Sequence, residues 1–322
     1  MLKALVVLCV VAISKIHCDE ENKLIPSEDP TLPKERNYRK YIGEKEYDIP
    51  FKTRVSEPFV VGQTIHAVGT LNENPKRVDF NFHKGANKDA DMPLHFSIRF
   101  DEGIFSGKFV YNTFQDGNWS ENEQRISNPF KAGQEFDLRV RIYEEKFQVF
   151  ANRKEIGTFK QRQALSGIDH VSIRGDLTKL RLFHYGGRFF KSPYMATVNL
   201  VPQKRLDISA LATGKRCNIN LYREDKNFAL QVSARFNEGA IVRNAMTNNS
   251  WGEEERDGKM PINKDEIFDC TIINEEFSFQ IFFNGQRFAT FAHRGSPSDV
   301  KFLEIDGACD VHSVTVNDAT GV

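Results

Sequence analysis

The chain carries one short stretch twice, as residues 117–125 (GNWSENEQR) and residues 249–256 (NSWGEEER). These stretches hold the only two tryptophans of the sequence, which lie 132 positions apart (251 − 119). The same offset separates Asn112 from Asn244 and Phe147 from Phe279. A constant offset over so many positions indicates a duplication of whole domains. Each copy has about 130 to 140 residues, enough to bury a core of its own.

Both copies alternate apolar and polar residues with the period of a β-strand. Phe136 and Leu138 alternate with Asp137 and Arg139 in the first copy, and residues 217–221 and 277–283 alternate in the same way in the second. Short strands separated by Gly, Asn and Asp turns are typical of two antiparallel sheets packed face to face. The sequence therefore predicts an all-β chain with two β-sandwiches in tandem.

The start of the chain has the pattern of a leader. Residues 1–18 combine an early lysine with an apolar run of about ten residues, which fits a signal peptide and is shorter than the roughly 20 residues that cross a bilayer. We therefore expect a secreted protein without membrane insertion; a cytosolic chain with an apolar start is the alternative. The predicted domains are an acidic, Pro-rich tail (19–46), a first copy (47–185), a linker (186–194) and a second copy (195–322).

Charge and cysteine content exclude several classes of partner. Lys plus Arg equals Asp plus Glu, at 44 each, so no net field favours nucleic acid. Behind the leader, Cys217, Cys270 and Cys309 allow at most one internal disulfide, and Cys270 fits a core position. No Cys and His spacing suggests zinc and no Asp-rich loop suggests calcium, so neither a metal nor a cofactor is expected.

Polar side chains gather on one face of a predicted strand, residues 94–100 (LHFSIRF). A period of two places His95, Ser97 and Arg99 together, opposite the apolar residues. Further polar and aromatic residues follow at short intervals: Asn112, Trp119, Glu123 and Arg125. Fixed donors and acceptors beside one aromatic ring are what a monosaccharide needs, because its hydroxyls must be satisfied while an apolar ring face packs on an indole.

These residues resemble the site of a tandem-repeat galectin. The family pattern His-x-Asn-Pro-Arg, Val-x-Asn and Trp-Gly-x-Glu-x-Arg is similar to residues 95–99, 110–112 and 119–125, and the resemblance extends over about residues 47–318. It implies galectin-like jelly-roll sandwiches and a non-enzymatic, bivalent lectin that cross-links β-galactosides on glycoproteins or glycolipids.

The resemblance also implies a role for each residue of the first copy. His95 and Arg99 would bond the axial 4-hydroxyl of galactose, Asn112 and Glu123 the 6-hydroxyl, and Trp119 would stack on the ring. Arg125 would brace Glu123 and reach the neighbouring sugar.

The first copy departs from the family pattern at several positions. Ser97 replaces Asn and Ile98 replaces Pro. Glu123 lies one residue further from Trp119 than in the family, which leaves Glu121 or Asn122 as alternatives for part of its role. The segment around residues 105–108 is four residues longer than its counterpart, and we expect this loop to shape recognition beyond galactose.

The second copy departs further. It keeps five residues of the pattern at family spacing: Arg235, Asn244, Trp251, Glu254 and Arg256. Gln231 and Ser233 replace His and Asn and are expected to make weaker contacts, so the first copy is predicted to be the stronger site. The alternative is one working sugar site, with the second copy acting as a protein-interaction or altered-specificity module.

Three further patterns of the sequence bear on its function. A glycoside hydrolase needs two carboxylates about 5 to 10 Å apart, and neither Glu123 nor Glu254 has an acidic partner within its motif, so an enzyme is not expected.

Residues 174–176 (RGD) are interpreted as a structural turn, because residues 306–308 (DGA) occupy the same point of the second copy. Asn118 and Asn248 begin glycosylation sequons beside the two sites.

Overall fold

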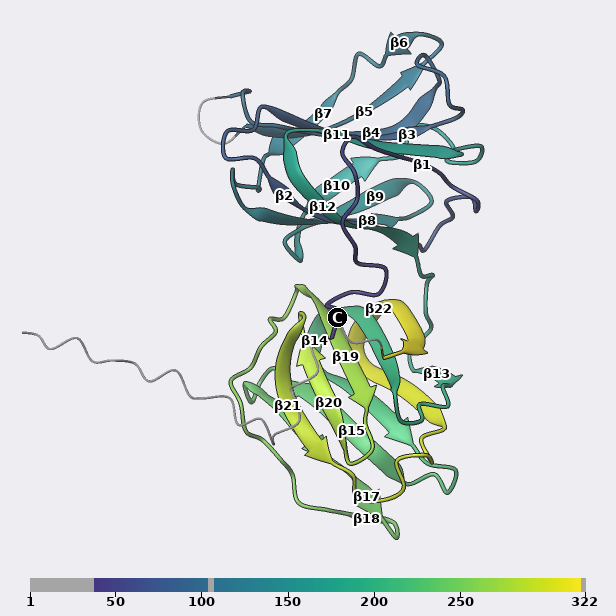
Figure 1. The fold of residues 1–322 in the computed structure, drawn as a ribbon, viewed down its shortest axis with the longest axis vertical. Helices are drawn as coiled ribbons and strands as arrows, with labels where there is room; N and C mark the ends of the chain where they lie inside the picture. Colours follow the sequence, from purple (N-terminus) through teal and green to yellow (C-terminus); the bar gives the residue numbers. More distant parts are fainter. Residues whose placement is uncertain (1–37, 104–106, 320–322) are drawn as a thin grey trace, which may run out of the picture. The chain divides into compact units, whose positions relative to one another are not determined.

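The computed structural model describes residues 38–103 and 107–319, and every regular element of these ranges is a β-strand (Figure 1). This confirms the predicted all-β fold. No helix in the described ranges is long and apolar enough to cross a membrane. The expected signal peptide (1–18) and residues 19–37 of the expected tail lie outside the described residues.

The first copy contains twelve strands, which form two antiparallel sheets. Their bounds are β1 Phe51–Arg54, β2 Thr64–Leu71, β3 Arg77–His83, β4 Met92–Arg99, β5 Lys108–Gln115, β6 Asn118–Trp119, β7 Gln124–Ser127, β8 Glu135–Ile142, β9 Lys146–Ala151, β10 Lys154–Lys160, β11 His170–Gly175 and β12 Leu177–Gly186. One sheet has the order β1-β11-β3-β4-β5-β6, with β7 also paired to β5, and the other has the order β10-β9-β8-β2-β12.

The core of the first copy lies between its two sheets. Phe80 and Phe96 of the first sheet are buried with Phe136 and Phe147 of the second. Phenyl rings suit this position because a buried ring without polar atoms requires no hydrogen-bond partner. The alternation predicted from sequence thus places the apolar side of β4 in the core and leaves its polar side on the outer face of the sheet.

The second copy is also built of antiparallel strands, and two of its strands are much longer than any strand of the first copy. Their bounds are β13 Tyr194–Thr197, β14 Lys204–Tyr222, β15 Phe228–Arg235, β16 Ala240–Asn244, β17 Met246–Thr247, β18 Ser250–Trp251, β19 Ile267–Asn274, β20 Ser278–Phe283, β21 Gln286–Ala292 and β22 Phe302–Asp318. The long strands β14 and β22 pair with each other along both halves of the sandwich, and their register shifts between Ala212 and Cys217.

A disulfide joins the two long strands beside this shift, between Cys217 and Cys309, and Cys270 is a free thiol buried in the second core. The pairing uses two of the three candidate cysteines, and the third fills the core position expected from sequence. Burial raises the pKa of the Cys270 thiol, which makes it an apolar core group and not a nucleophile.

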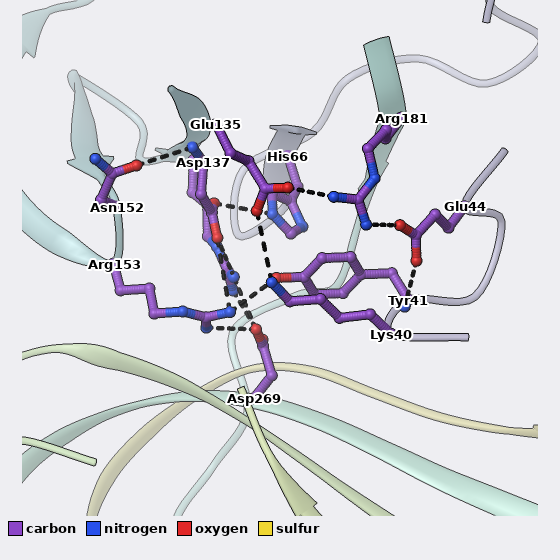
Figure 2. A network of polar contacts seen from close by, with 11 residues as sticks. Lys40, Tyr41, Glu44, His66, Glu135, Asp137, Asn152, Arg153, Arg181 and Asp269 are labelled. Atoms are coloured by element: carbon purple, nitrogen blue, oxygen red, sulfur yellow. Dashed lines mark hydrogen bonds and ion pairs between the residues drawn. The ribbon is translucent and has the colours of Figure 1, made fainter. Parts of the chain in front are cut away.

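A buried ionic network contains side chains from both copies and from the tail (Figure 2). Arg139 of β8 donates to Asp137 and to Asp269 of β19, each at 2.8 Å. Arg153 reaches Asp269 at 2.5 Å and the Tyr41 hydroxyl at 2.8 Å. Burial acts to raise the pKa of Asp269, but the charges of Arg139 and Arg153 outweigh it and lower that pKa below its usual value. The carboxylate is therefore held in its charged form.

Candidate functional site

Strand β4 presents His95, Ser97 and Arg99 on the outer face of its sheet, as the sequence predicts. All three side chains are nonetheless buried. His95 packs against Trp119, and Arg99 is bonded to Glu102 and Glu123. Ser97 donates to Asp79 of β3 at 2.7 Å and accepts from Arg99 Nε at 3.3 Å. A serine hydroxyl thus connects a carboxylate to the site arginine at the position where the family pattern has an amide.

The His95 ring has a defined protonation state. Its Nδ1 lies 2.6 Å from Asn81 Oδ1, and because a carbonyl oxygen only accepts, Nδ1 is the donor. Burial lowers the pKa of His95 to about 4, so the ring is neutral at pH 7 and Nε2 carries a free lone pair. This Nε2 is buried and has no hydrogen-bond partner among the described residues.

Arg99 stands in a four-membered network of charges. It donates to Glu123 at 2.9 Å and to Glu102 at 2.9 Å. Arg125 contacts the same two carboxylates, at 2.5 Å for Glu123 and 2.8 Å for Glu102. Burial acts to lower the pKa of Arg99, but the hydrogen bonds to Glu123 and Glu102 raise it. Two cations and two anions thus hold one another in fixed orientations.

Asn112 and Trp119 complete the first site from β5 and β6. Asn112 Nδ2 donates to the Ser120 carbonyl at 3.2 Å. The Trp119 ring lies 4.7 Å from the His95 ring between centroids, yet 45% of the residue is exposed. An exposed indole is unusual for a packing residue. Its open face is available to a ligand that also reaches His95.

The structure distinguishes the alternatives for the carboxylate after Trp119. Glu123 lies between Arg99 and Arg125, whereas the side chain of Glu121 has no contact recorded within the described residues and the Asn122 carbonyl accepts from Arg162. The extra residue of the segment is therefore accommodated before Glu123. Of the longer loop, residues 104–106 lie outside the described residues.

The second copy assembles its predicted residues in a similar way. Arg235 donates to Glu254 at 2.6 Å, Arg256 to Glu254 at 2.8 Å, and Asn244 to the Gly252 carbonyl at 2.9 Å. The hydrogen bond from Arg235 lowers the pKa of Glu254. Trp251 is 45% exposed, like Trp119.

The second copy differs from the first where His95 has been replaced. Gln231 Nε2 donates to Asn220 Oδ1 at 3.0 Å and Ser233 donates to Asn218 at 2.6 Å. The amide therefore keeps the strand-to-strand bond of the histidine, but it places an amide carbonyl where the first copy has a ring nitrogen.

Two pairs of site residues were not predicted from the sequence. Glu102 bridges Arg99 and Arg125, and Glu238 bridges Arg235 and Arg256 in the same manner. Each glutamate follows the strand arginine by three residues, and this shared spacing was the available signal.

The second missed pair is Arg162 and Arg294, which obey the 132-residue offset of the duplication. Arg162 donates to Asn112 Oδ1 at 3.2 Å, and Arg294 donates to Asn244 Oδ1 at 2.8 Å. Because the amide oxygen is occupied by arginine, the Nδ2 group of each asparagine is turned toward the loop that carries the tryptophan.

Other predicted features have structural explanations. The Asp176 carboxylate accepts from the backbone N–H groups of Lys76 and Arg77 at 2.8 and 3.0 Å, which gives residues 174–176 the role of a turn. Within residues 38–103 and 107–319, no three His, Cys, Asp or Glu side chains lie close enough to hold a metal ion.

Comparison with known proteins yields a consistent set of matches. The family described as "Galactoside-binding lectin" matches residues 50–184 and 193–316. A "32 kDa beta-galactoside-binding lectin" of Haemonchus contortus is 40% identical over 276 residues, which cover 83% of this chain and 95% of that protein. "Galectin-4" of Sus scrofa is 29% identical over 80% of this chain and 92% of its own length. The crystal structure of Caenorhabditis elegans galectin LEC-6 is 31% identical, covers 40% of this chain and 93% of its own, and has a TM-score of 0.39.

Proposed function

The chain belongs to the galactoside-binding lectin family, and from this premise we propose that its first copy binds the galactose ring of β-galactosides with His95, Arg99 and Trp119. The family consists of carbohydrate-binding lectins and not of enzymes, and the Haemonchus contortus relative is a β-galactoside-binding lectin by name. The residue roles, the number of working sites and the location of the protein are parts of the proposal.

The observation that carries the proposal is the unpartnered His95 Nε2 beside Arg99. Four of the five N–H groups of Arg99 have protein acceptors within the described residues, and one N–H of Nη2 remains. One hydroxyl that donates to Nε2 and accepts from Nη2 satisfies both groups. The axial 4-hydroxyl of galactose has this double role, and it leaves the C3 to C5 hydrogens on one ring face free to pack on Trp119.

The same arrangement discriminates against glucose. An equatorial 4-hydroxyl points away from the strand, so His95 Nε2 and the remaining N–H of Arg99 Nη2 would both stay without a hydrogen-bond partner. Each such group costs about 1 to 3 kcal/mol. We therefore propose that the site prefers lactose to cellobiose by at least tenfold, which corresponds to about 1.4 kcal/mol.

The second copy is proposed to be the weaker site. Arg235, Asn244, Trp251, Glu254 and Arg256 retain the ring platform and the donor set, but Gln231 replaces the histidine acceptor. Two sites on one chain gain avidity on clustered glycans by raising the effective concentration of the second binding event. We propose that residues 47–185 and 195–322 form the two binding domains of a bivalent cross-linker.

A second candidate function is restricted to this weaker site. The replacement of His by Gln favours an altered-specificity module in the second copy, because Gln231, whose Nε2 donates to Asn220, offers an amide carbonyl where His95 offers a ring nitrogen. The two candidates differ in the number of lactose molecules bound per chain.

Calorimetry with lactose on the full chain and on matched variants tests the proposal. Trp119→Ala and Trp251→Ala remove equivalent exposed rings, so each variant is the control for the other. We expect Trp119→Ala to abolish the tighter binding event and Trp251→Ala to leave it. Unchanged lactose binding in Trp119→Ala, with its circular dichroism spectrum intact, would reject the first site.

Secretion remains a separate part of the proposal. It is supported by the lysine and the apolar run of residues 1–18. Mass spectrometry of the mature amino terminus, after expression in a cell with a secretory pathway, is expected to find a start near residue 19. A mature protein that retains residues 1–18 would contradict it.

A further inference from the structure

A short segment ahead of the first copy lies against both copies. This segment, residues 38–47, is called the strap below, and most of it belongs to the tail expected from the sequence. At its start, the Tyr38 hydroxyl donates to Glu275, between β19 and β20, at 2.5 Å. The Arg39 carbonyl accepts from the buried Arg205 of β14 at 2.7 Å. The first residues of the strap are therefore held by the second copy.

The end of the strap is held by the first copy. The backbone N–H groups of Lys45 and Tyr47 donate to the carbonyls of Arg181 and Leu180, each at 3.0 Å. The Glu44 carboxylate pairs with the Arg181 side chain (Figure 2). Both partners belong to β12, which is the edge strand of its sheet. An edge strand has backbone groups that can pair with an added segment, and the strap occupies part of this edge.

The middle of the strap lies at the junction of the two copies. The Tyr41 hydroxyl accepts from Arg153 of the first copy at 2.8 Å, and Arg153 also binds Asp269 of the second copy. The Lys40 stem passes so close to Gly285 of the second copy that a Cβ at this glycine would lie 2.3 Å from Lys40 Cγ. Ten residues of chain thus connect the two copies through side chains and backbone.

The junction under the strap is polar and incompletely filled. It contains a cavity of about 360 Å³, lined by the strap, by His66 of β2 and by Asp207 of β14. The direct bonds across the junction include those of Asp269 and the 2.8 Å bond from the Ile267 N–H to the Arg153 carbonyl. Buried ion pairs orient their partners but add little net stability, because the loss of hydration offsets the attraction of the charges. Domains joined by such an interface are expected to move relative to each other unless a further contact holds them.

We propose that the strap is this further contact and that it locks the two copies into one rigid body. It pairs with β12 at one end and is bound by Glu275 and Arg205 at the other, so it holds each copy through groups outside the ionic network. The two sites that contain Trp119 and Trp251 then keep a fixed separation and direction. A rigid pair of sites favours glycans at one spacing, whereas a flexible tether accepts any spacing within its reach. This consequence for glycans rests on the proposed function, but the strap itself does not.

NMR relaxation of the backbone amides in the full chain tests the strap. It gives a rotational correlation time for each copy without any sugar present, so the result does not depend on the proposed function. In wild type we expect one correlation time shared by residues 47–185 and 195–322. In a chain with Tyr38→Ala and Tyr41→Ala, both times should shorten by up to about twofold, because each copy has about half of the folded mass and then tumbles partly on its own. The circular dichroism spectrum of this double variant should match that of wild type.

A milder pair of variants keeps the test decisive if the double variant does not fold. Glu275→Ala removes the acceptor of the Tyr38 hydroxyl. Glu276→Ala is the matched control, because this neighbouring side chain is exposed and makes no hydrogen bond or ion pair within residues 38–103 and 107–319. Glu275→Ala should shorten the correlation times by a smaller amount than the double variant, and Glu276→Ala should leave them unchanged.

Three results would overturn the strap. They are separate correlation times for the two copies in wild type, a shared time that persists in a folded double variant, and, where the double variant is unfolded, equal times in Glu275→Ala and Glu276→Ala. Calorimetry with lactose on the same proteins separates the two proposals. Correlation times that change as expected in a chain that does not bind lactose would support the strap and reject the proposed function.

Discussion

Replacing His95 by glutamine removes one titrating group and reproduces the residue of the second copy. Gln231 keeps a 3.0 Å hydrogen bond to Asn220, so glutamine at position 95 is expected to keep the equivalent bond to Asn81 and to fold. Burial lowers the pKa of His95 to about 4 in the folded chain, against about 6.5 in an unfolded chain. A shift of that size corresponds to roughly 3 kcal/mol of stability at pH 7.

The direction in which stability changes with pH follows from the protons that each state binds. Between pH 6.5 and 4 the unfolded chain binds the proton at His95 and the folded chain does not, so the contribution is fully present above about pH 6.5 and is lost as the pH falls to about 4. Urea unfolding of the first copy, followed in the full chain by Trp119 fluorescence in the Trp251→Ala background, should show wild type losing this stability relative to His95→Gln. Equal pH dependence of the two proteins, or an NMR titration of His95 near pH 6.5, would refute the reasoning.

Three further predictions concern the groups around the site and the buried network. Glu102→Gln weakens the bridge between Arg99 and Arg125 and should lower lactose affinity about three- to tenfold, which corresponds to the loss of about 1 kcal/mol of charge-assisted hydrogen bonding. Calorimetry that finds the same lactose affinity as in wild type would show that this bridge does not contribute to binding. Arg162→Lys keeps the charge but not the planar guanidinium group that orients Asn112. The difference in affinity between lactose and its 6-deoxygalactose analogue should therefore become smaller. An unchanged difference would exclude a role of Arg162 in positioning Asn112. Asp269→Ala leaves Arg139 with Asp137 as its remaining carboxylate partner and should destabilise the chain by about 2 to 3 kcal/mol in urea unfolding, and a variant as stable as wild type would contradict the importance of the network.

The sequence was sufficient to predict the strands and the two faces of each sheet, but not what covers those faces. Alternation along β8 correctly separates Phe136 and Leu138 from Asp137, Arg139 and Arg141. It places the charged residues away from the core, yet Arg139 and Arg141 are fully buried. The period of a strand shows which of its faces turns away from the core of its own sandwich. It does not show whether a segment distant in the sequence, such as the one that contains Asp269, covers that face.

The geometry of the candidate site was predictable for the residues that lie on strands, whereas contacts made by residues on loops were missed. His95, Ser97 and Arg99 follow from a period of two, and their spacing fixes them on one face. Glu102 and Arg162 lie in segments without a period, so only the equivalence of the two copies pointed to them. The disulfide was undetermined for a related reason: three cysteines allow three pairs, and Cys217 is bonded to Cys309 at the break in register between β14 and β22, which the sequence does not show.

A crystal structure of the full chain with lactose tests the central claim most directly. We predict a galactose ring stacked on Trp119, with its 4-hydroxyl within about 3 Å of both His95 Nε2 and an Arg99 Nη atom, the distance of an ordinary hydrogen bond. A first site that stays empty at saturating lactose, or a sugar bound there with its 4-hydroxyl turned away from His95 and Arg99, would contradict the account.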